Sequence, residues 1–125
     1  ALVDKRREGN DDRAIASTII GDVKDKNAII FDDEIDTAGS MMETVKVLNK
    51  FGARNIYAGC THGILSGPAI ERIKDSAIKE LVVTNTVPLP EEKRIDKITV
   101  LSIAPLFAEA IKRIHNEDPL GELFR

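Results

Sequence analysis

The chain has 125 residues, a formal net charge of −3, 42% hydrophobic residues and 31% charged residues. This composition is ordinary for a globular protein, and we expect a single domain over residues 1–125 with a modest core. The negative charge and the 4% of aromatic residues argue against a nucleic-acid partner, because nucleic-acid-binding domains usually present a basic surface. No apolar run is long enough to cross a bilayer and no signal-peptide pattern occurs, so we expect no membrane partner and a cytoplasmic location.

The first part of the chain predicts two strands that flank a charged loop. Residues 1–4 are mostly apolar and predict a strand, and residues 15–23 predict a second strand that returns from the loop. Residues 5–13 between them are charged, contain Gly9 and Asn10 and lack apolar periodicity, which predicts a mobile loop. Because residue 1 is Ala and already falls within an expected strand, the sequence suggests a fragment or a processed chain.

A short apolar run at residues 28–31 ends abruptly in two carboxylates. The run predicts a strand covered on both faces, as in a parallel sheet. Asp32 and Asp33 follow it directly, so we expect both side chains at the carboxyl edge of the sheet, where ligands of open α/β sheets bind. The alternative for this pair is a solvated acidic strand end without a ligand.

The next segment, residues 36–40, reads Asp-Thr-Ala-Gly-Ser and precedes a predicted helix over residues 40–50. Short acceptor side chains of this kind cap helix N-termini, and Gly39 allows the backbone to approach a ligand closely. Free N–H groups and the helix dipole at such a position favour a phosphate. The alternative is a capped helix without a ligand. Together with the paired acids, the order of these features favours a site for a phosphorylated sugar.

The remaining segments alternate between strands and helices. Strands are predicted over residues 55–60, 78–84 and 97–102, and helices over residues 66–75 and 105–116. Ser66 is expected to be the N-cap of the first of these helices, and Gly52 is expected just beyond the C-terminal end of the helix at 40–50. The alternation predicts an α/β domain with a parallel sheet and right-handed connections.

Two reactive side chains have ordinary structural interpretations. Cys60 is the only cysteine, so an internal disulfide is excluded, and its place in an apolar run predicts a buried thiol. His62 follows the same run, and we interpret it as structural rather than catalytic. The sequence contains no His-Glu-x-x-His, Cys-x-x-Cys or Gly-x-x-x-x-Gly-Lys-Ser/Thr motif, so it does not support a zinc hydrolase or a P-loop nucleotidase.

Residues 28–40 resemble the phosphoribosyl-diphosphate (PRPP) motif that type I phosphoribosyltransferases share with ribose-phosphate diphosphokinase (PRPP synthetase). Further segments resemble the synthetase, at residues 4–7, 20–23, 61–69, 80–86 and 108–115. The resemblance runs nearly end to end and matches the carboxy-terminal part of the class I bacterial-type enzyme. It implies a parallel-sheet, type I phosphoribosyltransferase-like fold with flanking helices, and it implies that the amino-terminal half of the two-domain synthetase is absent.

The resemblance also implies a reaction and a set of site residues. The reaction is the Mg²⁺-dependent transfer of the diphosphoryl group of ATP to the 1-hydroxyl of ribose 5-phosphate, with PRPP and AMP as products. Lys5 and Arg7 match catalytic cations of the family's flexible loop, and Asp32 and Asp33 match groups that bind the ribose hydroxyls and help to hold Mg²⁺. The residues expected to bind ribose 5-phosphate are Asp32, Asp33, Asp36, Thr37, Ala38, Gly39 and Ser40. ATP, ribose 5-phosphate and a homo-oligomer, by resemblance a hexamer, are the implied partners.

Two other functions remain open at the level of the sequence. The segment at residues 32–40 fits a PRPP-consuming phosphoribosyltransferase equally well, although residues 5–7 and 61–69 fit that class less well. A non-catalytic, synthetase-associated regulatory subunit is the other alternative. It is motivated by the missing half and by the acidic run at residues 8–12, where the family has further Arg and Asn residues.

Overall fold

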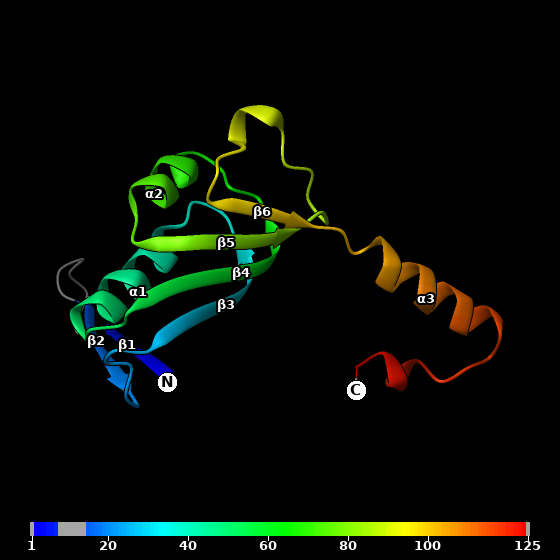
Figure 1. The fold of residues 1–125 in the computed structure, drawn as a ribbon, viewed down its shortest axis with the longest axis horizontal. Coiled ribbons are helices and arrows are strands. Elements are labelled where there is room, and N and C mark those ends of the chain that lie inside the picture. Colours follow the sequence, from blue (N-terminus) through cyan, green and yellow to red (C-terminus); the bar gives the residue numbers. More distant parts are fainter. Residues whose placement is uncertain (1, 8–14, 125) are drawn as a thin grey trace.

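A computed structural model describes residues 2–7 and 15–124 of the chain (Figure 1). Its main feature is a four-stranded, fully parallel sheet. The strands are β3 (Asn27–Ile35), β4 (Asn55–Gly63), β5 (Ile78–Thr84) and β6 (Ile98–Leu101). A separate antiparallel hairpin consists of β1 (Leu2–Arg7) and β2 (Ile15–Ile20). The helices are α1 (Gly39–Lys50), α2 (Ala69–Asp75) and α3 (Ala104–His115), with short 3₁₀ turns η1 (Glu91–Lys93) and η2 (Leu120–Phe124).

The strand order in the sheet equals the chain order, β3-β4-β5-β6. Right-handed connections in such a sheet all cross on the same side, so α1 and α2 lie together on one face. The core lies between these two helices and the sheet. The core residues are Val23, Ile35, Ala38, Met41, Val45, Leu48, Ile56, Ala58, Cys60, Leu65, Ala69, Ile73, Ile78, Leu81 and Val83. The predicted parallel α/β architecture is therefore confirmed.

The expectation that residues 28–31 are covered on both faces is wrong. Ile29 and Phe31 are 61% and 81% exposed, whereas Ala28 and Ile30 are partly buried against the core. In a sheet whose connections cross on one side, the other face of β3 has no helix over it among the described residues. The strand also continues past its apolar residues, through Asp32 and Asp33 to Ile35. The two acids thus lie within the strand rather than beyond its end.

Helix α1 begins at Gly39, one residue before the predicted start, and ends at Lys50 as predicted. Gly52 has φ +81° and donates its N–H to the Asn49 carbonyl (3.0 Å), so the predicted glycine after the helix is confirmed. The predicted N-caps are wrong. The N-cap of α1 is Ala38, without a side-chain cap hydrogen bond. Helix α2 begins at Ala69, after Pro68, and Ser66 does not cap it.

The first hairpin corrects the predicted start of the charged loop. Strand β1 continues through Arg7, with Lys5 paired in register with Ser17 and Arg7 paired with Ile15. Lys5 and Arg7 therefore belong to a strand and not to a loop that starts at residue 5. Residues 8–13, the rest of the predicted loop, lie outside the described residues.

Helix α3 extends away from the sheet, and η2 folds back beside it (Figure 1). Arg113 joins the two, because it forms ion pairs with Glu109 at 3.0 Å and with Glu122 at 2.9 Å. No residue of α3 is buried. None of the helices in the described ranges has both the length and the apolar character needed to cross a membrane.

Candidate functional site

The carboxyl-terminal half of β3 presents three consecutive acids, Asp32, Asp33 and Glu34, all of them exposed. The Asp33 backbone N–H donates to Asp32 Oδ1 at 3.0 Å. Because consecutive side chains of a strand start on opposite faces, the Asp32 and Asp33 carboxylates begin on different sides of the sheet. The arrangement offers negative oxygens to both sides of this strand end.

The chain then turns through Asp36 and Thr37 into α1. Ala38 is buried and has φ 60° and ψ 12°, a left-handed conformation that costs free energy for any residue with a Cβ. Its carbonyl accepts the Met42 N–H at 3.0 Å, the first hydrogen bond of the helix. The N-cap residue Ala38 makes no side-chain cap hydrogen bond, and the positive end of the helix dipole lies at this turn.

The following β–α unit holds this turn in place. The Ser66 N–H donates to the Asp36 carbonyl at 3.0 Å, and the Ser66 hydroxyl donates to Asp36 Oδ1. Arg72 Nη1 donates to the Thr37 carbonyl at 2.7 Å. The Asp36 carboxylate, which the resemblance places among the ribose 5-phosphate ligands, accepts the Ser66 hydroxyl in this structure.

His62 lies on β4, in register with Glu34. Its Nδ1 is 2.9 Å from Thr86 Oγ1, and the hydroxyls of Thr84 and Thr86 both donate to the Thr61 carbonyl at 2.7 Å. Thr84 Oγ1 also lies 2.9 Å from Thr86 Oγ1, so His62 joins a network of hydroxyls. These contacts between neighbouring strand ends account for His62 without a ligand.

Cys60 is 7% exposed and belongs to the core, so the predicted buried thiol is confirmed. Burial, together with the nearby negative charge of Asp32, raises the pKa of Cys60 to about 11. The thiol is therefore protonated and unreactive at neutral pH.

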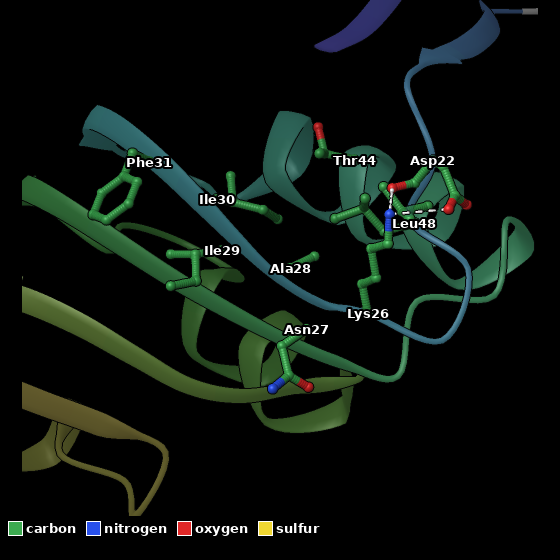
Figure 2. A pocket seen from close by; sticks show the side chains of 10 residues that line it. Asp22, Lys26, Asn27, Ala28, Ile29, Ile30, Phe31, Thr44 and Leu48 are labelled. Carbon is green, nitrogen blue, oxygen red and sulfur yellow. Dashed lines mark hydrogen bonds and ion pairs between the residues drawn. The ribbon is translucent and has the colours of Figure 1, made fainter. Parts of the chain in front are cut away.

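A hollow of about 460 Å³ lies along the outer edge of β3, toward its amino-terminal end (Figure 2). Alkyl groups of Ala28, Ile29 and Ile30 form much of its lining. Asp22 and Lys26 at one end pair with each other at 3.0 Å, and the hydrogen bond from Lys26 lowers the pKa of Asp22. The hollow contains none of the sequence-predicted site residues.

The structure brings Asp32, Asp33 and residues 36–40 together at one strand end, but it does not bring Lys5 and Arg7 there. The β1–β2 hairpin lies beside α1 and toward the amino-terminal end of β3, whereas the turn between β3 and α1 is at the other end of that strand (Figure 1). The side chains of Lys5 and Arg7 are not among the described ones, and their catalytic role stays a prediction. Within the described part of the chain, no group of three or more His, Cys, Asp or Glu side chains could share a metal ion.

A family model described as "Phosphoribosyl synthetase-associated domain" matches residues 11–125. The chain belongs to this family. Two relatives named ribose-phosphate pyrophosphokinase are similar to it along nearly its whole length: that of Clostridium acetobutylicum is 54% identical over 125 residues, and that of Caldanaerobacter subterraneus is 58% identical over 124 residues. The crystal structure of phosphoribosylpyrophosphate synthetase from Mycobacterium smegmatis matches 84% of the chain with a TM-score of 0.78 and 41% identity.

These similarities confirm the sequence-based resemblance to the synthetase family and the type I phosphoribosyltransferase-like fold. The chain spans 39% of the length of the two pyrophosphokinases and 35% of the crystallised synthetase chain.

Two side chains that hold the turn at residues 36–40, Ser66 and Arg72, were not recognised from the sequence. Ser66 was interpreted as a helix cap, and Arg72 had no predicted role. Ser66 is 30 residues from Asp36 and Arg72 is 35 residues from Thr37, with α1 and β4 between them, so no local pattern connects them to the turn. Only the parallel pairing of β3 with β4, which brings the ends of these strands together, could have pointed to the Ser66 contact.

Proposed function

We propose that the protein acts in PRPP synthesis, through transfer of the diphosphoryl group of ATP to the 1-hydroxyl of ribose 5-phosphate. The name of its relatives, ribose-phosphate pyrophosphokinase, supports this assignment over a PRPP-consuming transferase. The observation that carries it is the turn at residues 36–40. There the start of α1, whose N-cap Ala38 makes no side-chain cap hydrogen bond, follows a strand that carries three consecutive acids near its end.

In this proposal the turn binds the 5-phosphate. The backbone N–H groups of residues 37–40 and the Thr37 and Ser40 hydroxyls surround the anion, and the dipole of α1 adds a favourable potential. Since the Asp36 carboxylate is held by Ser66, it supports the loop from behind rather than facing the phosphate. In this arrangement the negative charge of Asp36 does not face the phosphate, so it does not repel the ligand directly.

Asp32 and Asp33 accept hydrogen bonds from the ribose hydroxyls in this arrangement. Their exposed carboxylate oxygens also suit Mg²⁺, which prefers hard oxygen ligands and retains several waters. Because the two side chains start on opposite faces of β3, each supplies a separate contact, and neither forms a chelate with the other. Bound Mg²⁺ would neutralise charge on the transferring phosphates.

Lys5 and Arg7 are proposed to stabilise the transferring diphosphoryl group, as the resemblance implies. Positioned cations act on charge that develops in the transition state, and this is the main demand of phosphoryl transfer. The relatives are about two and a half times as long as this chain, so we propose that much of the ATP site comes from sequence beyond these 125 residues.

A homo-oligomer in the cytoplasm completes the proposal. The exposed apolar side chains of α3, Leu106, Phe107, Ile111 and Ile114, support an assembly because they offer area that association could bury. Sedimentation of the protein expressed from its natural reading frame would show a species larger than a monomer. A monomer at all accessible concentrations would contradict this part.

The decisive experiment supplies that same protein with ATP, Mg²⁺ and ribose 5-phosphate and separates the products. AMP and PRPP should form in equal amounts, and neither should form without the sugar phosphate. Release of diphosphate from added PRPP that depends on a nucleobase would instead support a phosphoribosyltransferase. Absence of both reactions, with activity restored to a longer homologue by addition of the chain, would support the regulatory alternative.

A further inference from the structure

Arg72 contacts the proposed phosphate loop from outside the loop's own sequence. It lies on α2, and its Nη1 donates to the Thr37 carbonyl at 2.7 Å. The same nitrogen is 3.5 Å from the position that a Cβ on Gly39 would occupy. The guanidinium therefore lies against the backbone on both sides of Ala38, the residue with the left-handed conformation.

This contact fixes the direction of a backbone N–H. No peptide bond in the described chain is cis, and in a planar trans peptide the carbonyl and the following N–H point in opposite directions. Because Arg72 holds the Thr37 carbonyl toward α2, the Ala38 N–H must point away from α2. Without that hydrogen bond, the peptide between Thr37 and Ala38 could rotate and withdraw the N–H from an anion.

The contact uses properties of arginine that lysine lacks. The guanidinium is permanently charged and planar, and its other N–H groups stay available to the same stretch of backbone. A positive charge at this distance adds to the potential of the α1 dipole at the loop. Ser66 holds the preceding residue, Asp36, so one segment of the chain fastens both halves of the turn.

We propose that Arg72 is a positioning residue for the ribose 5-phosphate site, one that sets the peptide orientation at residues 37–38 and thereby the affinity for the 5-phosphate. The proposal rests on the proposed function, since it assumes that the turn binds this ligand. It assigns Arg72 no contact with ATP and no part in the chemical step.

The test compares Arg72→Ala, Arg72→Lys and Lys74→Ala with the unchanged protein, each expressed from the natural reading frame. Lys74→Ala is the matched control, because it removes one positive charge from an exposed residue of the same helix. Loss of a hydrogen bond that involves a charged group should raise KM for ribose 5-phosphate about tenfold in Arg72→Ala. KM for ATP and kcat should stay within about twofold, Arg72→Lys should be intermediate, and the control should behave as the unchanged protein.

Two further readouts separate positioning from general damage. Millimolar methylguanidinium should lower the raised KM of Arg72→Ala, because it can occupy the vacated space and donate to the Thr37 carbonyl. Titration with inorganic phosphate, followed by the Ala38 amide signal in NMR spectra, should shift that signal in the unchanged protein and shift it less in the variant. If Arg72→Ala does not fold, KM for ribose 5-phosphate and the phosphate titration of Arg72→Lys decide the question.

An unchanged KM for ribose 5-phosphate in a folded Arg72→Ala protein would overturn the proposal. Equal increases in KM for both substrates, or an equal effect of Lys74→Ala, would overturn it too. These outcomes leave the proposed function intact, since the unchanged protein would still bind the sugar phosphate. An unchanged protein that neither forms PRPP nor responds to phosphate would overturn the proposed function, and this inference with it.

Discussion

Helices α1 and α3 are both twelve residues long and both amphipathic, yet they have opposite surroundings. Helix α1 buries Met41, Val45 and Leu48 against the sheet, whereas α3 buries no residue and extends away from it (Figure 1). Apolar periodicity therefore predicted both helices correctly but could not show which of them has a partner within this chain. The buried face of α1 also fixes the position of its N-terminus, which is a requirement for a backbone anion site.

The largest expected effect is on stability and tests this difference directly. Leu48→Ala in α1 should lower the free energy of unfolding by about 2–4 kcal/mol, because a 5% exposed leucine leaves a cavity when it is truncated. Leu106→Ala in α3 is the matched change, at a side chain that is 47% exposed, and in protein diluted until it is monomeric it should change stability by less than about 0.5 kcal/mol. Urea denaturation of both variants gives the comparison. Similar losses would show that α3 is packed as firmly as α1.

The next effect concerns the acids beside α1. Replacing Asp32 and Asp33 together with Asn should weaken ribose 5-phosphate binding by at least about tenfold, since each change removes a charged hydrogen-bond acceptor. The fold should be spared because both side chains are exposed. Neutralising Glu117 and Asp118 at the end of α3 by Gln and Asn removes the same charge and should leave binding unchanged. Calorimetric titration with and without Mg²⁺ would measure both variants, and equal affinities would refute the sugar role of the acids.

A smaller effect is expected for two serines, Ser66 before α2 and Ser102 before α3. Ser66→Ala removes the hydroxyl that donates to Asp36, and it should lower stability by about 1 kcal/mol and also weaken phosphate binding. Ser102→Ala removes the Oγ that accepts the Ala104 N–H at 3.2 Å at the start of α3, and it should affect stability alone. Thermal unfolding with and without added phosphate would separate the two. If added phosphate raised the midpoint temperature of unfolding by the same amount in both variants, Ser66 would not support the phosphate-binding turn.

The smallest effect is expected for Cys60, which belongs to the same core as the buried residues of α1. Burial raises the pKa of Cys60 from 9.0 to about 11, so the folded protein keeps the thiol proton at pH values where the unfolded chain loses it. The contribution to stability is constant below about pH 9 and falls as the pH rises toward 11, because deprotonation then favours the unfolded state. Unfolding measured across this range should show a steeper decline for the unchanged protein than for Cys60→Ala. Parallel curves would show that the thiol titrates normally.

Much of the fold followed from local patterns. The strand at residues 78–84 and the helix at residues 40–50 were predicted to within one residue, since apolar periodicity and Gly52 marked them. The exposure of Phe31 could not be predicted, because its sequence neighbours are those of a buried strand and exposure depends on what lies across the sheet. The caps were wrong for a related reason. Asp36 and Ser66 have the side chains of helix caps, but the folded chain brings them together, and each satisfies the other.

The candidate site shows the same limit. Its acids and its turn are contiguous in sequence and could be recognised there, whereas Arg72 reaches Thr37 only through the packing of α2 beside α1. Lys5 and Arg7 were placed at the start of a loop, but their backbone belongs to β1, since pairing with residues 15 and 17 extends the strand beyond its apolar residues. Periodicity does not detect such polar extensions.

A crystal structure of the protein with ribose 5-phosphate tests the central claim most directly. The account predicts that the 5-phosphate accepts hydrogen bonds from the backbone N–H groups of residues 37–40, with the ribose hydroxyls toward Asp32 and Asp33. A sugar phosphate bound elsewhere while this turn holds no ligand, or N–H groups of the turn directed into the core, would contradict it.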